Sequence, residues 1–198
     1  MIHALAERMA SAFVSGGAAD PEDKDIYTYG CETILSACFT FVSCMLVSLL
    51  FGRLLEGLLV FAVFVTIRHF TGGHHAEQHW GCILASSCIC AGVLFIVSVL
   101  PPGLYQPMVA ASALVALISI FILAPVEHKN KPLSARNRLL LKKKSRIVVL
   151  GFFAVVIAGV FLWTSPLVLA VSLSMLSVSG SMAYATLIHH MRKGGGIQ

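Results

Sequence analysis

The chain has 198 residues, of which 58% are hydrophobic and only 12% are charged, and its mean hydropathy is +0.88. Soluble domains carry about 25% charged residues, so this composition excludes a soluble globular protein and indicates an integral membrane protein. The net charge of +5 does not require a nucleic-acid partner, because the membrane topology predicted below accounts for it.

Six apolar runs predict membrane-spanning helices, since about 20 residues are needed to cross the hydrocarbon core. They fall at residues 34–51, 54–67, 83–100, 108–126, 147–164 and 166–188. The second run reaches full length only if Arg53 and Glu56 extend toward the headgroups at one end. We therefore expect an all-α, polytopic membrane domain with about six helices. It would occupy residues 26–190, after an N-terminal segment (1–25) and before a cytoplasmic tail (191–198).

The basic residues predict the orientation of these helices. With the N-terminus inside, 13 of the 14 lysines and arginines fall on the cytoplasmic side, and only Arg53 lies outside. This distribution follows the positive-inside rule and favours an even number of spans. We expect a multi-pass cell-membrane protein with both termini in the cytoplasm.

The N-terminal segment carries a helical pattern of its own. Ile2, Leu5, Met9 and Phe13 recur at the spacing of one helix face. Such a stripe is typical of a short helix lying on the inner leaflet. A plain cytoplasmic tail explains it equally well.

Residues 68–82 concentrate the groups that bind metals or transfer protons. Five such residues lie in this segment: His69, His74, His75, His79 and Cys82. Uncompensated polar groups beside apolar spans are costly, so their presence points to function. We expect the chemistry of the protein in this segment.

Cys82 has the sequence context of a nucleophile. It follows Gly81 and opens the apolar run that begins at Ile83, which predicts a position in the first turn of a helix. The positive end of the helix dipole and a nearby imidazole both favour the reactive thiolate. Most cysteines in membrane spans are only small hydrophobic side chains, and this remains the competing interpretation.

Two histidines compete for the role of general base. His79 is three residues from Cys82, so one helical turn would place the two side by side. His75 is seven residues away, about 10 Å along a continuous helix, which is too far for a hydrogen bond. His75 could serve only if the chain breaks between them, at Gly72-Gly73 or at Gly81. Spacing alone favours His79.

A metal site is the main rival from the residues themselves. His74, His75, His79 and Cys82 are suitable zinc ligands. However, the glutamate in His-Ala-Glu-Gln-His is one place off the His-Glu-x-x-His pattern of helical zinc proteases. We therefore expect neither a metal nor another cofactor. A transporter with histidines along a cation path, or a zinc-binding membrane protein, remains the alternative function.

Two further polar residues near the predicted site have ordinary explanations as well as functional ones. Glu32 is an interfacial carboxylate, or a partner for an imidazole or for Arg68. Ser86 lies one turn after Cys82 and either faces the site or hydrogen-bonds its own helix backbone.

The central segment resembles the signature of the AgrB family, membrane cysteine endopeptidases of quorum sensing. The matching elements are Arg68, the pair Gly72-Gly73, His75-Ala76 and Cys82, in the order and spacing of the family. Tyr29-Gly30-x-Glu32 and the stretch at 124–133 are also similar, and the resemblance covers roughly residues 26–190.

The resemblance implies that Cys82 is the nucleophile and His75 the base, against the spacing argument for His79. It implies cleavage of the C-terminal part of a small AgrD-like propeptide through a Cys82 thioester. An internal cysteine or serine would then close a thiolactone or lactone. The chain should be non-helical somewhere between His75 and Cys82, and a homodimer is expected from the family alone.

The same resemblance assigns supporting roles. Arg68 would stabilise the oxyanion or hold a peptide carboxylate, or it merely anchors the topology, and Gly72 and Gly73 would shape the loop. The basic loop, Lys129 to Arg146, would bind anionic lipid, or hold an acidic recognition segment of the propeptide. Its candidate contacts are Lys129, Lys131, Lys142, Lys143 and Lys144.

Overall fold

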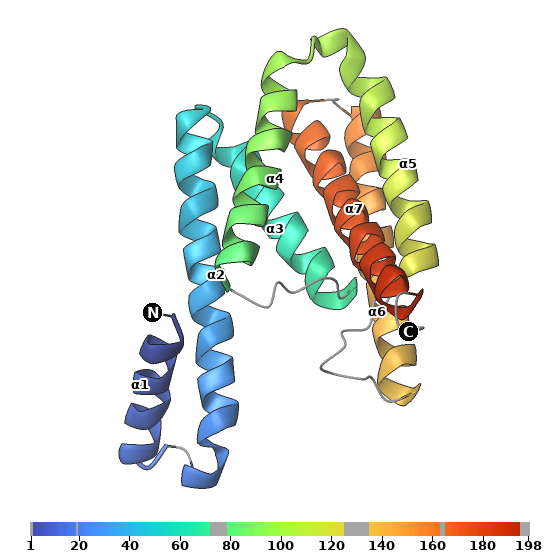
Figure 1. The fold of residues 1–198 in the computed structure, drawn as a ribbon. Coiled ribbons are helices and arrows are strands. Elements are labelled where there is room, and N and C mark those ends of the chain that lie inside the picture. The colour runs from blue at the N-terminus through green and yellow to red at the C-terminus, as the bar shows by residue number, and fades with distance from the viewer. Residues whose placement is uncertain (1, 19, 72–78, 125–134, 163–164, 195–198) are drawn as a thin grey trace.

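The computed structural model describes residues 2–18, 20–71, 79–124, 135–162 and 165–194, without the side chains of residues 79, 135–138, 188–190 and 192–194. All regular structure in these ranges is helical (Figure 1). The helices are α1 (Ile2–Ser15), α2 (Lys24–Leu50), α3 (Leu54–Thr71), α4 (His79–Val99), α5 (Tyr105–Leu123), α6 (Ala135–Leu162) and α7 (Pro166–Gly194), with short 3₁₀ helices η1 (Pro21–Asp23) and η2 (Pro102–Leu104).

Within the described residues, the six helices α2 to α7 are long and apolar enough to cross a membrane. The predicted all-α, polytopic architecture is thus confirmed. Two helices begin much earlier than their apolar runs, α2 at Lys24 and α6 at Ala135. Residues 135–146 contain good helix formers and no glycine or proline. The second half of the predicted basic loop is therefore helical.

The boundaries drawn at residues 25 and 191 both fall inside helices. Residue 25 lies in the first turn of α2, and α7 continues through residue 191 to Gly194. Each terminal segment is therefore continuous with a long helix.

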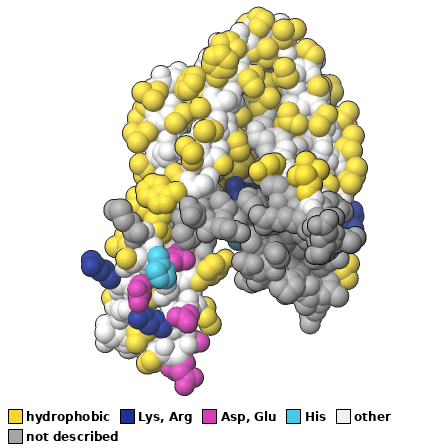
Figure 2. Space-filling view, viewed as in Figure 1, with side chains coloured by type: hydrophobic (Ala, Val, Ile, Leu, Met, Phe, Trp, Pro, Cys, Tyr) yellow, Lys and Arg dark blue, Asp and Glu magenta, His cyan; other side chains and the backbone are white. Residues whose placement is uncertain are grey.

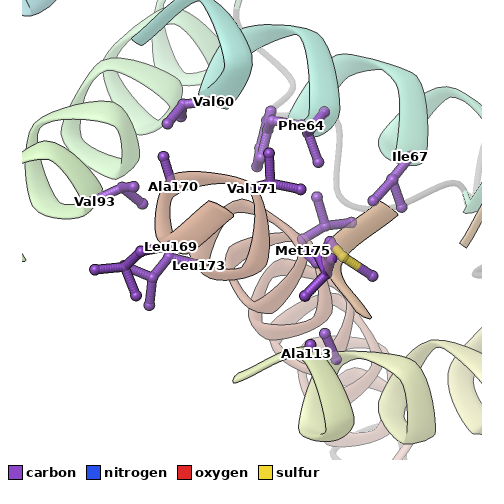
Figure 3. Packing of buried hydrophobic residues seen from close by; sticks show 14 of the residues in the cluster. Val60, Phe64, Ile67, Val93, Ala113, Leu169, Ala170, Val171, Leu173 and Met175 are labelled. Carbon is purple, nitrogen blue, oxygen red and sulfur yellow. The ribbon is translucent and has the colours of Figure 1, made fainter. Parts of the chain in front are cut away.

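The helix α7 forms the centre of the bundle. Over its most apolar window 56% of the residues are buried, against at most 33% in the other spans. Figure 3 shows its residues from Leu169 to Met175 packed between α3, α4 and α5. The contacting side chains include Val60, Val93 and Ala113. Because α7 is enclosed in this way, packing against it holds α3, α4 and α5 in position.

The helices α3 to α7 alternate in direction, so their ends gather at two ends of the bundle (Figure 1). We call one the Cys82 end, where α3 and α5 finish and α4 and α6 begin. The other is the Arg53 end, where the α2–α3 turn lies. At that turn Gly52 has a φ of +63°, and Arg53 N–H donates to Ser48 C=O at 3.0 Å. This Schellman geometry needs a glycine and ends α2 sharply.

Arg53 itself closes the Arg53 end of the bundle. Its Nη1 donates to Glu56 Oε1 at 2.9 Å, and its Nε donates to Ser98 Oγ at 3.0 Å. Two donor groups of this guanidinium therefore have acceptors, and one of the bonds ties the start of α3 to the end of α4.

The helix α1 packs along the first half of α2, forming a hairpin at the edge of the bundle (Figure 1). Ile2, Ala6 and Ala10 are buried against α2, whereas Leu5 and Phe13 are 44% and 43% exposed. The predicted N-terminal helix is present, but Ile2, from its apolar stripe, is used for packing on α2. Figure 2 shows acidic, basic and histidine side chains on this hairpin, and a largely hydrophobic surface over the described part of the bundle above it.

Candidate functional site

Cys82 lies in the first turn of α4, as the sequence predicts. Of the six cysteines, all of which are in the described part of the chain, only Cys82 begins a helix in this way. It shares the inner stripe of α4 with Ser86 and Cys90, which are 6% and 0% exposed. Cys88 lies on the opposite, exposed face. The thiol of Cys82 is half-buried on the side of the helix that faces the bundle.

A seam of small polar side chains holds α4 against α2. Ser43 Oγ and Ser87 Oγ are 2.7 Å apart, and Ser87 Oγ also donates to Ile83 C=O at 2.8 Å. Further along, Ser48 Oγ is 3.9 Å from Cys90 Sγ. Small and hydroxyl-bearing residues let membrane helices approach closely and bond across their interface. The seam therefore fixes the position of the helix that carries Cys82.

The same stretch of α2 continues into a second tight contact, with α3. A Cβ placed on Gly57 would lie 1.7 Å from Ser48 Oγ and 2.5 Å from Ser48 Cβ. Only a glycine fits at this position without a shift of one helix. Gly57 thus sets the spacing of α2 and α3.

Glu32 lies beyond Cys82 along the bundle axis, on the projecting hairpin. The contacts Ser43–Ser87 and Ser48–Cys90 show that α2 and α4 run in the same direction. Residue 82 is thus level with about residue 38, and Glu32 lies roughly 9 Å further along the axis. The imidazole that Glu32 contacts is that of His3 on α1, with Oε1 2.5 Å from Nδ1. The structure therefore places this carboxylate in the α1–α2 interface.

Arg68 lies in the last turn of α3, at the Cys82 end. Its side chain is half-buried, and its Cζ lies 5.5 Å from the centroid of the Phe64 ring, one turn earlier. A guanidinium over an aromatic face is held by cation–π attraction. This contact holds the Arg68 side chain against α3, the helix next to α4.

Several predicted site residues lie outside the described part of the chain. These are Gly72, Gly73, His75, Lys129 and Lys131. The backbone of His79 starts α4, so His79 and Cys82 share a helical turn, although the side chain of His79 is outside the description. Gly81 is helical. Gly81 is therefore not a break, and a turn that brings His75 to Cys82 has to lie before residue 79.

The metal interpretation also rests on residues that are not described. Among the described residues there is no group of three His, Cys, Asp or Glu side chains that could hold a metal. Three of the four predicted ligands fall outside this search.

An apolar cavity of about 170 Å³ lies between α3, α6 and α7, lined by Leu59, Val155, Val156, Leu167, Val168 and Val171. It has no polar group and is not part of the site.

The basic side chains on α6 divide into two kinds. Lys142, Lys143 and Lys144 are exposed, whereas Arg146 is half-buried and its Nε is inaccessible to solvent. The sequence prediction treated Arg146 as the end of a loop, because the apolar run starts at residue 147. In the sequence, Arg146 differs from the other basic residues of the predicted loop because it follows Ser145 and continues an uninterrupted helical pattern.

Ser86 is buried one turn from Cys82, and its C=O accepts from Cys44 Sγ at 3.9 Å.

Comparisons with known proteins agree with this picture. The family model of accessory gene regulator B (AgrB) matches residues 6–186. An AgrB-like protein of Clostridium perfringens is 27% identical over 158 residues, covering 77% of this chain and 74% of its own length. An AgrB-like protein of Listeria welshimeri is 25% identical over 191 residues, covering 95% and 93%.

Protein FsrB of Enterococcus faecalis is 29% identical over 137 residues, covering 66% of this chain and 55% of its own length. No solved structure matches the chain. Because the family model spans nearly the whole chain and includes both Arg68 and Cys82, this protein belongs to the AgrB family.

Proposed function

We propose that this protein is a membrane cysteine endopeptidase of quorum sensing. It cleaves off the C-terminal part of a small AgrD-like propeptide and promotes cyclisation of the remainder. The observation that carries the proposal is the position of Cys82, half-buried in the first turn of α4 and on its inner stripe. The family match supports the same function.

The reaction begins with proton transfer from the Cys82 thiol to His75. The thiolate attacks the scissile carbonyl, and the C–N bond breaks as His75 returns the proton to the leaving amine. The products of this step are the C-terminal fragment and a peptidyl thioester on Cys82. The start of α4 assists because its unpaired backbone N–H groups stabilise negative charge on the sulfur.

The thioester keeps the acyl group activated for a second transfer. A cysteine thiol or serine hydroxyl within the bound peptide attacks the thioester carbonyl, and its proton passes through His75 to the departing Cys82 sulfur. This closes a thiolactone or a lactone and regenerates the enzyme. Excluding water from a half-buried site favours this internal attack over hydrolysis.

Supporting residues act around this thiol. Arg68 stabilises the oxyanion or holds a peptide carboxylate, since its guanidinium is always charged and binds planar oxygen pairs. Gly72 and Gly73 allow the turn that brings His75 to the sulfur, and Ser86 packs one turn below it. Lys142, Lys143 and Lys144 attract the acidic part of the propeptide to the Cys82 end.

We also propose the setting of the reaction. The Cys82 end faces the cytoplasm, both termini lie on that side, and the protein works in the cell membrane in contact with anionic lipid. It acts as a homodimer. The supporting observation for the orientation is that Lys142–Lys144 and Arg68 belong to this end, whereas Arg53 belongs to the other.

Substitution of single cysteines and histidines tests the proposal. Cys82→Ser should abolish propeptide cleavage, whereas Cys88→Ser, an exposed cysteine on the other face of α4, should leave it intact. His75→Ala should remove activity and His79→Ala should retain most of it. Full activity of Cys82→Ser would overturn the proposal, and loss only in His79→Ala would reassign the base.

Metal analysis of the same variants tests the alternative. A zinc-binding protein or a histidine-lined transporter would hold stoichiometric metal that is lost, together with activity, in Cys82→Ala. The proposal predicts unchanged cleavage by wild-type protein after treatment with a chelator.

A further inference from the structure

Arg146 carries a buried donor group for which the described residues provide no acceptor. Its Cζ lies 5.1 Å from the centroid of the Phe121 ring, so the guanidinium stacks on α5. Its Nε is inaccessible to solvent and makes no hydrogen bond within the described part of the chain. A charged donor buried without an acceptor is destabilising, so such groups are usually satisfied or functional.

A second half-buried arginine, Arg53, shows how this fold satisfies a structural arginine. At the Arg53 end, Nε of Arg53 donates to Ser98 Oγ and Nη1 donates to Glu56 Oε1. The Nε of Arg53 thus has a serine acceptor, whereas the Nε of Arg146 has none among the described residues. The difference between the two arginines lies in their partners and not in their exposure alone.

Acidic residues of the described chain lie away from Arg146. Glu56 is at the Arg53 end, and six acids belong to the α1–α2 hairpin: Glu7, Asp20, Glu22, Asp23, Asp25 and Glu32. The hairpin packs at the α2 edge, whereas Arg146 packs against α5 on α6. The cations beside Arg146 on its own helix are the exposed Lys142, Lys143 and Lys144.

We propose that Arg146 is a substrate-binding residue that receives a carboxylate of the peptide at the Cys82 end. The inference rests on the proposed peptidase function and names one contact of its substrate. A carboxylate is a planar pair of oxygens that matches Nε and one Nη of a guanidinium in two parallel hydrogen bonds. Phe121 holds the plane of the guanidinium, and Nε is the donor that lacks an acceptor among the described residues.

The burial of the Arg146 Nε favours a peptide carboxylate over a lipid phosphate as its ligand. Lipid headgroups approach the outer surface of α6, where Lys142, Lys143 and Lys144 are exposed. The Nε of Arg146 is instead inaccessible to solvent.

Binding of the AgrD-like propeptide encoded beside the gene tests the inference. The full chain carrying Cys82→Ser is placed in phosphatidylcholine vesicles, and the dissociation constant of fluorescein-labelled propeptide is measured by anisotropy. A second propeptide has its Asp, Glu and C-terminal carboxyl groups converted to amides. We expect Arg146→Gln to weaken binding of the acidic propeptide at least about tenfold and that of the amide version less than twofold.

Two matched variants separate geometry from charge. Arg8→Gln removes one positive charge from an exposed residue of α1, outside the proposed binding residues, and should change binding less than threefold. Arg146→Lys keeps the charge but loses the paired donors, so it should recover only part of the affinity. Equal losses in Arg146→Gln and Arg8→Gln, or full recovery in Arg146→Lys, would overturn the inference.

Further outcomes exclude the other sources of an anion. An effect of Arg146→Gln that depends on added phosphatidylglycerol would assign the residue to lipid. An equal effect of Glu127→Gln would assign it to an internal ion pair. Both results contradict the inference. Because binding is measured in a variant that lacks the Cys82 thiol, absence of cleavage by wild-type protein would contradict the proposed function and leave this result standing.

Discussion

Ser43 Oγ on α2 and Ser87 Oγ on α4 lie 2.7 Å apart, five residues further along α4 than Cys82. Ser87 also donates to Ile83 C=O, the residue next to Cys82. The pair therefore joins the helix that carries the proposed nucleophile to the helix that carries the N-terminal hairpin. It is the clearest link between the packing of this bundle and its chemistry.

Removing the two hydroxyl groups should measure this link directly. Ser43→Ala and Ser87→Ala should each destabilise the protein modestly, and the double variant should lose less than the sum. The expected coupling is about 0.6 kcal/mol, the typical value for hydrogen bonds between membrane helices. Reversible unfolding in detergent micelles gives the free energy of unfolding of each of the three variants relative to the wild-type protein. Strict additivity would mean that the two hydroxyl groups do not interact.

Gly57→Ala should destabilise the bundle more than any nearby glycine substitution. The new Cβ would overlap Ser48 Oγ, and relief requires α2 and α3 to separate, at a cost of about 1–3 kcal/mol. Gly92→Ala is the matched control, because a Cβ on this glycine of α4 meets nothing within 4 Å. Thermal melting of the two variants checks the difference, and equal melting temperatures would contradict the close approach.

The orientation can be tested at the two ends of the bundle. A reporter enzyme that functions only outside the cell should be active when it is inserted at Gly103, in η2 at the Arg53 end. The same reporter fused after residue 198 should be inactive, and a cytoplasmic reporter should give the opposite pattern. Activity of the outside reporter at the C-terminus would reverse the proposed topology.

Charge reversal on α6 separates substrate recognition from lipid attraction. In Lys142→Glu/Lys143→Glu/Lys144→Glu, the exposed lysines would repel an acidic peptide, so KM for the propeptide should rise at least about tenfold with kcat little changed. Labelling of an engineered external cysteine confirms correct insertion before the kinetics are measured. Unchanged processing in correctly inserted protein would remove these lysines from substrate binding.

The sequence predicts the membrane helices well because their signal is simple. Runs of apolar residues near the length of a bilayer specify spans, and Arg53 stands out as the one cation that the predicted topology places outside. It predicts the start of α4 less directly: the apolar run begins at Ile83, yet the helix begins at His79. The early start matters because it removes Gly81 as a break and moves any turn toward His75 before residue 79.

The contacts between helices are much harder to predict. Ser43, Ser48 and Gly57 look like ordinary small residues in apolar spans, and only the register of α2 against α3 and α4 makes them neighbours. From the sequence, Glu32 is either an interfacial carboxylate or a partner for an imidazole or for Arg68. The imidazole found, His3, is 29 residues away and requires the α1–α2 hairpin. Arg146 was assigned to a loop because composition does not reveal where a basic helix end turns inward.

The most direct test is mass spectrometry of purified protein in vesicles after incubation with the propeptide. The account predicts an acyl adduct on Cys82 with the mass of the N-terminal peptide portion, sensitive to hydroxylamine and absent from His75→Ala. The adduct should still form in Cys88→Ser. A cleaved propeptide without any adduct on Cys82, or an adduct that survives in His75→Ala, would contradict it.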